Sequence, residues 1–389
     1  MPYQIKFAKA PAGYVLENAA AGAPVKIAVR EFTSSEDGAV FVSRLEGFPL
    51  EILERIGIPD KVSPSTIDHM VAVIGADGQT QVYVNECPIF VRIRAARTLQ
   101  AGQTVREDDI VDVAGLRFEG VDCPPTAGIV CVFSSGWRKG LFFDLTPIGP
   151  DRPKRAYDLE SVLGSHFAYL MNQSIFQLSE EQWRLLFAQR WFPFVSLPKR
   201  LVRAMVTTVR GKHQVDQHLP EIGDVLNQML PELRTRWAGV DLLAPHLSLL
   251  LHALDRYAER DYISATALLY PRIEGVLRSI HAAFDSAAKA TVKRLSSAAV
   301  SAGEATHEYS WLLPAKFSQF LEEVYFANFQ PGQTAPLSRH SLSHGVASAA
   351  DFDLKSASIG VLIVDQLRFM MPAKPPNNAL EPAARTDDD

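Results

Sequence analysis

The stretch Thr146-Pro147-Ile148-Gly149-Pro150-Asp151-Arg152-Pro153 separates two parts of the chain that have different sequence patterns. Its three prolines and one glycine interrupt both strand and helix periodicity. Short Val- and Ile-rich runs precede it, and segments with apolar residues at helical spacing follow it. We therefore predict an α+β chain, with a β-rich domain over 1–150 and an all-α region after it.

The part before this stretch is predicted to be mainly β-structure. Its candidate strands are bounded by Gly, Asp, Asn and Pro, and they cover residues 4–8, 25–30, 39–43, 70–74, 81–85 and 89–93. Two antiparallel hairpins are predicted, pairing 68–74 with 81–85 and 129–133 with 141–144. Ile52, Leu53 and Ile56 share one face at helical spacing, which predicts one short helix over 50–56.

The part after the stretch is predicted to be helical. A capping box, in which Ser179 reaches forward and Gln182 reaches back, begins one helix. Further helices are predicted at 157–172, 199–211, 222–230, 247–260, 262–284, 287–298, 315–328 and 354–371. We divide this region into a helical middle part over 151–240, a helical bundle over 241–372 and a disordered tail over 373–389.

Composition excludes several classes of protein. A chain of 389 residues that is 47% hydrophobic and 21% charged is neither fibrous nor wholly disordered. The net charge of −5 argues against nucleic-acid binding through bulk charge alone. Three cysteines without a CxxC motif indicate a reducing compartment. Because no signal peptide or long apolar run is evident, we expect a cytoplasmic protein that does not associate with membranes.

The stretch Leu337-Ser338-Arg339-His340-Ser341-Leu342-Ser343-His344-Gly345 carries the candidate chemistry. In a helix, His340 and His344 share a face, and Arg339 flanks them. A guanidinium binds phosphoryl oxygens bidentately, while a histidine titrates near neutral pH and can move a proton. Motifs for nucleotide-binding loops, a hydrolase nucleophile elbow and a zincin site are absent from the sequence.

The spacing Arg339-His340-x-x-x-His344 resembles the R-x4-6-H motif of the HEPN superfamily. The glycine after it and the helix predicted at 354–371, with its Asp365-Gln366-Leu367, are similar to the ending of many bacterial HEPN-like proteins. The segment 262–278 resembles the helix that such proteins place before the motif. The resemblance covers 241–371, about a third of the chain.

The resemblance implies a metal-independent endoribonuclease that acts as a homodimer on RNA, needs no cofactor, and leaves 2′,3′-cyclic phosphate ends. It implies a toxin or phage-defence setting. His344 is then the general acid or base, Arg339 stabilises phosphorane charge, and His340 positions substrate or carries a second proton. Glu274 either orients a basic partner or pairs with Arg278 four residues later.

Two alternatives use the same residues. In the first, the bundle is a non-catalytic dimerisation or binding scaffold with an N-terminal ligand-sensing domain, for which a pocket near Trp137 would be the sign. In the second, His340 and His344 bind a metal, with His307 and Glu308 as further candidate ligands. The scaffold alternative predicts a packed helix end at Arg339.

A basic stripe on the helix predicted at 199–211 is the candidate RNA-binding surface. Arg200, Arg203 and Arg210 fall on one face, opposite an apolar face. Alternatively, these arginines pair with carboxylates of the acidic N-terminal domain. The neighbouring aromatic residues are expected to be core rather than base-stacking platforms, and they are Trp183, Phe187, Trp191, Phe192 and Phe194.

Overall fold

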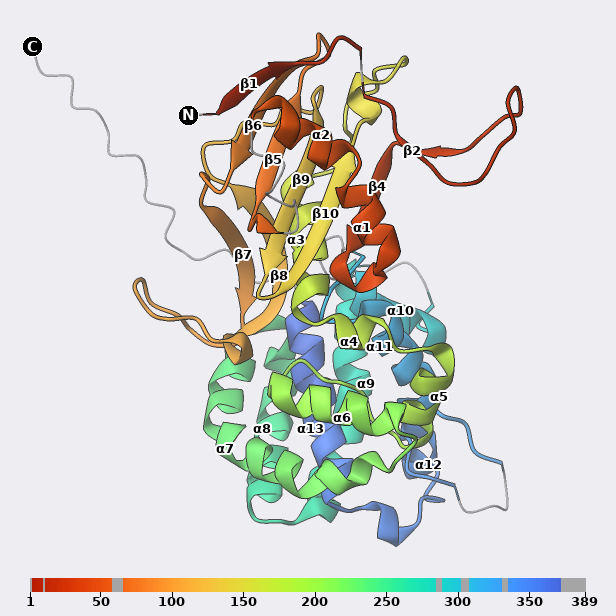
Figure 1. Cartoon of the computed structure of the whole chain (residues 1–389). Coiled ribbons are helices and arrows are strands. Elements are labelled where there is room, and N and C mark those ends of the chain that lie inside the picture. Colours follow the sequence, from red (N-terminus) through yellow and green to blue (C-terminus); the bar gives the residue numbers. More distant parts are fainter. Residues whose placement is uncertain are drawn as a thin grey trace, which may run out of the picture. The chain divides into compact units, whose positions relative to one another are not determined.

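The computed structural model describes residues 2–9, 11–57, 66–284, 289–301, 308–330 and 335–371. The predicted α+β class is confirmed, with the strands in the N-terminal region and a helical C-terminal region (Figure 1). The chain forms two compact units: Met1–Ser179 with His307–Trp311, and Glu180–Thr306 with Leu312–Asp389. The predicted tail at 373–389 lies outside the described residues.

The first unit is built on a six-stranded antiparallel sheet in the order β1-β6-β5-β9-β10-β4. These strands are β1 (Tyr3–Lys6), β4 (Arg30–Ser34), β5 (Met70–Ile74), β6 (Gln79–Val84), β9 (Gly128–Ser135) and β10 (Arg138–Asp144). Two smaller sheets pair β2 (Tyr14–Val15) with β3 (Ile27–Ala28), and β7 (Ile89–Ala95) with β8 (Ile110–Phe118). The remaining elements of this unit are α1 (Ala39–Leu45), α2 (Phe48–Arg55), α3 (Leu159–Met171), α4 (Gln173–Phe176), and short 3-10 turns at Ser35–Asp37, Glu107–Asp109 and Thr146–Ile148.

Both faces of the central sheet are covered, as the sequence of β5 shows. All five residues of β5, Met-Val-Ala-Val-Ile, are buried. Met70, Ala72 and Ile74 pack in one cluster with residues of α1 and α2, while Val71 and Val73 pack in another with residues of β8 and α3. The continuous apolar run therefore reflects burial on two sides.

The predicted hairpins form, and the second is tighter than expected. β5 pairs with β6, and β9 pairs with β10 as far as Ser135 opposite Arg138, so that only Gly136 and Trp137 form the turn. Gly136 has a φ of 61°, which a two-residue hairpin turn requires and glycine adopts at little cost.

The strand predicted at 39–43 is wrong, because this segment belongs to helix α1. Its β-branched residues alternate as in a strand, but Phe41 and Leu45 are the buried pair, at helical spacing, and Val40 and Val42 are exposed. The aspartate Asp37, which accepts the backbone N–H of Ser34, fixes the turn just before α1. Packing of Phe41 and Leu45 under the sheet outweighs the local β-propensity.

The second unit consists of helices, almost all at the positions that periodicity predicts. They are α5 (Glu180–Ala188), α6 (Lys199–Arg210), α7 (Leu219–Ala238), α8 (Leu247–Ala258), α9 (Tyr262–Phe284), α10 (Val292–Ser301), α11 (Pro314–Phe320), a π-helical turn (Leu321–Tyr325), α12 (Arg339–Ser343) and α13 (Leu354–Met370), with 3-10 turns at Val215–His218, Asp241–His246 and Ala349–Asp351. Helix α7 continues past Pro231, where the sequence predicted an end, because Leu226, Leu230, Leu233 and Trp237 form one buried face.

No single helix of the described residues is long and apolar enough to cross a membrane. One bent pair, 215–238 with 241–258, passes the same test by length and composition only.

Helix α13 forms the centre of the second unit, and it carries a buried carboxylate. Asp365 accepts hydrogen bonds from Trp237 Nε1 at 3.0 Å and from Ser196 Oγ at 2.6 Å. The guanidinium groups of Arg236 and Arg368 lie 3.4 and 3.3 Å from its oxygens. Asp365 is fully buried, so these donors replace the water that a carboxylate otherwise needs.

A segment from far along the chain belongs to the first unit. The Ser310 hydroxyl and the Trp311 N–H donate to the carboxylate of Asp112 on β8, and the Tyr309 N–H donates to Ser165 Oγ at 2.9 Å. Burial raises the pKa of Asp112. We call residues 308–311 the strap, and these hydrogen bonds fix it to β8 and α3.

Helix α3 approaches β8 closely at two glycines, and this contact carries a prediction. A Cβ on Gly164 would lie 2.4 Å from the Cα of Gly115, which is backbone and cannot rotate away. We expect Gly164→Ala to lower the free energy of unfolding by at least about 1–3 kcal/mol, measured by urea denaturation. The control is Gly149→Ala, where the nearest atom is 3.4 Å from the added Cβ. Equal denaturation midpoints for the two variants would contradict this account of the contact.

The Asp365 cluster carries a second prediction. Asp365→Asn leaves Arg236 and Arg368 facing a neutral amide in the interior, so we expect a loss of about 3–5 kcal/mol in the free energy of unfolding. The matched control is Asp255→Asn, which removes a carboxylate 2.5 Å from Arg234 in a half-exposed pair and should cost less than about 1 kcal/mol. If urea denaturation gives similar losses in the free energy of unfolding for both variants, the burial of Asp365 does not set the size of the loss.

Candidate functional site

The predicted turn of helix at 337–345 exists as α12, and its two ends are fixed by local interactions. At the start, the Ser341 N–H donates to Ser338 Oγ at 3.1 Å, and the Ser338 N–H donates to Ser341 Oγ at 2.8 Å. Ser338 Oγ also donates to the carbonyl of Ala327 at 2.8 Å. At the end, Gly345 has a φ of 68°, a left-handed conformation that favours glycine. Ser338, which precedes Arg339, and Ser341, which follows His340, therefore cap the start of the turn.

The guanidinium of Arg339 forms an ion pair with the carboxylate of Glu274 on α9. The same carboxylate lies 2.7 Å from Nη2 of Arg278, one turn further along α9. Glu274 is buried, whereas the Arg339 side chain keeps 29% of its surface exposed. A buried carboxylate thus orients a partly exposed guanidinium, and both roles considered for Glu274 are present at once.

The two histidines of the turn occupy different environments. His340 is half-buried, 6.1 Å from the ring of Phe326, and its Nε2 has no hydrogen-bond partner among the described residues. Burial, and then the charge of Arg339, lower the pKa of His340, while Glu274 opposes this shift. His344 is exposed, with its ring 5.2 Å from that of Phe329. His340 is therefore neutral at physiological pH, and His344 is open to solvent.

The aromatic residues around the turn are neighbours of the candidate site that the sequence did not predict. Tyr325, Phe326 and Phe329 follow α11, and the Tyr325 hydroxyl donates to the carbonyl of Tyr270 at 2.6 Å. Burial and Glu274 raise the pKa of Tyr325 well above its usual value, so this phenol stays protonated. The aromatic run between two helical segments was the only signal in the sequence. Residues 339–344 thus offer an oriented cation, a neutral imidazole and an accessible imidazole.

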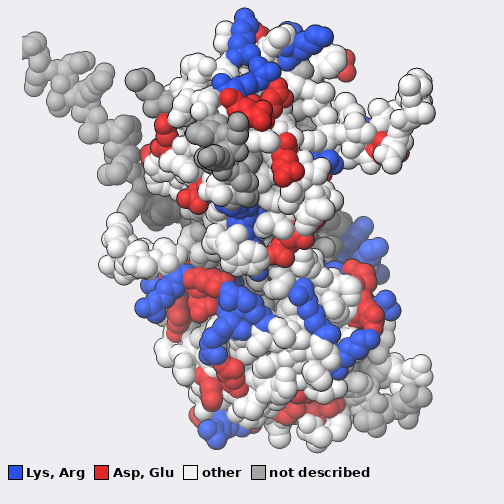
Figure 2. Space-filling model, viewed as in Figure 1, with Lys and Arg blue, Asp and Glu red and all other residues white. Residues whose placement is uncertain are grey.

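The basic stripe on α6 has the predicted orientation. Arg200, Arg203 and Arg210 are exposed, and the opposite face of α6 is buried. Arg200 pairs with Glu221 on α7. Figure 2 shows basic and acidic side chains interspersed over the visible face of the helical unit. The aromatic residues near this helix are buried, as expected of core, and they are Trp183, Phe187, Trp191, Phe192 and Phe194.

The structure adds no metal ligand to His340 and His344 from the residues that it describes. Among the described residues, no group of three or more His, Cys, Asp and Glu side chains is arranged to hold a metal ion. His307 lies outside the described residues. Glu308 belongs to the strap of the first unit, where it lines a pocket.

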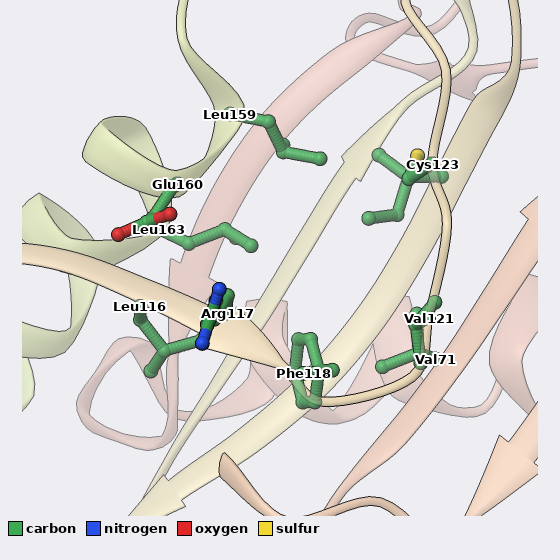
Figure 3. A pocket seen from close by; sticks show the side chains of 10 residues that line it. Val71, Leu116, Arg117, Phe118, Val121, Cys123, Leu159, Glu160 and Leu163 are labelled. Atoms are coloured by element: carbon green, nitrogen blue, oxygen red, sulfur yellow. The ribbon is translucent and has the colours of Figure 1, made fainter. Parts of the chain in front are cut away.

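The first unit contains an apolar cavity of about 160 Å³ between β8 and α3 (Figure 3). Its walls are mostly Val, Leu, Ile and Phe side chains, together with Cys123. Burial raises the pKa of Cys123, which keeps this thiol protonated. Glu160 at this cavity pairs with Arg92 at 3.1 Å. Trp137, at the tip of the β9–β10 hairpin, is 71% exposed and does not line this cavity.

The charges around His340 carry a prediction about its titration. Glu274→Gln removes a charge that raises the pKa of His340, so we expect this pKa to fall further below its usual value of 6.5. Arg339→Gln removes a charge that lowers it, so the pKa should rise. NMR titration of the imidazole Cε1–H signals measures both shifts, and a spectrum of His340→Asn identifies the signal.

The control for this titration is Glu259→Gln, which removes an exposed carboxylate 2.8 Å from Arg256 on α8. It should leave the pKa of His340 unchanged, because screening by water weakens the field of a distant exposed charge. Shifts of the same sign in Glu274→Gln and Arg339→Gln would contradict the proposed electrostatics.

Comparison with known proteins gives no information about the function of this site. No protein-family model, no curated protein and no solved structure matches this chain. The assignment of chemistry to α12 consequently depends on the residues themselves, on their contacts with α9 and on the motif that they resemble.

Proposed function

We propose that the chain is a metal-independent endoribonuclease of HEPN type, acting as a toxin or phage-defence effector. The observation that carries this proposal is that α12 begins with a guanidinium, Arg339, that the buried Glu274 carboxylate orients, and is followed directly by an exposed imidazole, His344. RNA cleavage without a metal needs a proton carrier beside the ribose 2′-hydroxyl and a fixed positive charge beside the phosphate. Arg339 is the first residue of α12, and His344 is the residue that directly follows this helix.

Each residue of the turn has a distinct proposed role. His344, which is accessible, takes the proton from the 2′-hydroxyl or delivers one to the leaving 5′-oxygen. Arg339 stabilises the negative charge of the phosphorane through its fork of N–H donors. His340, neutral and half-buried, positions the substrate or carries a second proton. The product is a 2′,3′-cyclic phosphate, because the attacking oxygen belongs to the substrate.

The proposed substrate surface and assembly extend beyond the turn. The stripe of Arg200, Arg203 and Arg210 on α6 would contact the phosphate backbone, where cations bind RNA without regard to sequence. A homodimer that brings two α12 turns together completes the site in this proposal. The resemblance to the HEPN motif supports the dimer, and the exposure of His344 is compatible with it.

A non-catalytic scaffold is the second candidate, and two observations favour it. The Arg339–Glu274 ion pair and the buried serines of the capping box are also what a structural helix end requires. In that case the bundle serves dimerisation or binding, and the histidines have no reactive role. Activity measurements separate the two candidates.

The decisive experiment compares RNA cleavage by the purified chain with cleavage by His344→Ala, in the presence of EDTA. We expect the native chain to cleave RNA to 2′,3′-cyclic phosphate ends, and the variant to lose about 100-fold or more of the rate, which is the typical contribution of general acid–base catalysis. The matched control is His252→Ala, an exposed histidine on α8, which should keep full activity.

Folding is checked separately by thermal unfolding, since His344 is exposed and its replacement should not alter stability. Arg339→Ala is a weaker test because it also breaks the ion pair with Glu274. Intact RNA with the folded native chain, or equal cleavage by His344→Ala, would overturn the nuclease proposal in favour of the scaffold.

A further inference from the structure

The first unit contains a second pocket, more polar than the cavity of Figure 3. It has a volume of about 330 Å³ and lies where the edge strand β4 meets α3 and the strap. Its lining consists of Arg30, Glu31, Phe32, Phe142, His166, Glu308 and Tyr309. This volume is at the lower end of the range found for small-molecule sites.

A buried histidine in this lining lacks a hydrogen-bond partner. His166 is only 6% exposed, and its Nδ1 makes no hydrogen bond to the described residues. Its ring stacks on Phe32 with centroids 4.0 Å apart and lies 5.3 Å from Phe142. An unsatisfied buried polar atom costs about 1–3 kcal/mol, and few remain in native proteins without a ligand or water. The pocket is thus bordered by a buried imidazole with an unsatisfied nitrogen.

The imidazole is also fixed in its neutral form. Burial, and then the nearby charge of Arg30, lower the pKa of His166 to about 3. The ring accordingly contributes a hydrogen bond and an aromatic surface at physiological pH, but no charge.

The charged side chains that line the pocket are one cation, Arg30, and two carboxylates, Glu31 and Glu308. The Arg30 guanidinium lies over the ring of Tyr157, 3.8 Å from its centroid, and no carboxylate of the described residues forms an ion pair with it. Glu31 is already paired with Arg44 at 3.2 Å. Glu308 is exposed and accepts a hydrogen bond from the Tyr309 hydroxyl, whose pKa is raised by burial and by this carboxylate.

We propose that this pocket binds a small zwitterion with the chemistry of a free α-amino acid. Its carboxylate would bind Arg30 and its ammonium group Glu308, and its side chain would lie against the rings of Phe32, Phe142 and His166. A purely anionic ligand would face Glu308 at close range, and a purely cationic one would face Arg30. A molecule with both charges complements Arg30 and Glu308 together.

The pocket shares no residue with the proposed nuclease site, and ligand binding can be measured without an RNA-cleavage assay. Arg30 and Phe32 belong to β4, whereas Glu308 and Tyr309 belong to the strap, so the ligand would link segments that are far apart in the sequence. A ligand that binds only the folded state stabilises that state by mass action. Binding should therefore raise the unfolding temperature of the chain whether or not it cleaves RNA.

The experiment first screens the common free L-amino acids for those that raise the unfolding temperature of the full chain. Titration calorimetry then measures the affinity of each one that does. We expect at least one to bind. Its amide, which lacks the carboxylate, and its N-acetyl derivative, which lacks the ammonium group, should each bind about tenfold more weakly or worse, as expected for loss of a charge-assisted hydrogen bond.

Three variants locate the binding site. Arg30→Gln, Glu308→Gln and His166→Phe should each weaken binding about tenfold or more, and His166→Phe retains an aromatic ring against Phe32. The matched control is Arg117→Gln, an exposed arginine at the other cavity, which should bind normally. Glu308 is exposed, so its variant is expected to fold even if the others do not.

Two results would overturn the proposal. One is that no amino acid raises the unfolding temperature or gives binding heat with the folded chain. The other is that binding persists unchanged in Glu308→Gln and Arg30→Gln. Neither result depends on RNA cleavage, so a failure here is distinguishable from a failure of the nuclease proposal.

Discussion

The helical unit depends on one buried carboxylate, that of Asp365 in the middle of α13. A charge in the interior is tolerated only when donors replace its water, and here Trp237, Ser196, Arg236 and Arg368 do so. The next residue, Gln366, accepts from the Val195 N–H at 3.0 Å and donates to the carbonyl of Leu312 at 3.0 Å. These bonds join α13 to α7, to the chain before α6 and to the start of the α11 region.

The same principle operates on a smaller scale at the candidate active site. Glu274 is a buried carboxylate on α9, and its partners are two guanidinium groups, one of which belongs to α12. Helix α9 packs against α13, so the position of Arg339 follows from the packing of the central helix. Catalysis by preorganised charge requires this kind of support, because a guanidinium that must first be ordered contributes less in the transition state. The pair is therefore structural and, in our proposal, functional.

Local patterns predicted much of the fold because the elements concerned are long or bounded by strong signals. Helix α9 has the bounds that periodicity predicted, and the β5–β6 hairpin forms around Asp77 and Gly78. The segment 39–43 was predicted incorrectly, since its Val residues favour a strand while its tertiary contacts favour a helix. At the candidate site, the sequence pattern singled out Arg339, His340 and His344, which stay a prediction, but not the aromatic residues beside the two histidines.

The sequence by itself determined the α+β class, the main hairpins, the amphipathic face of α6 and the capped turn that carries Arg339 and His344, because each depends on residues close together in the chain. Only the tertiary structure decided which distant groups meet. It set Glu274 beside Arg339, and it placed Glu308 and Tyr309 beside Arg30 and His166. Such contacts follow from the packing of whole elements around buried apolar and charged groups, which no local pattern of residues encodes.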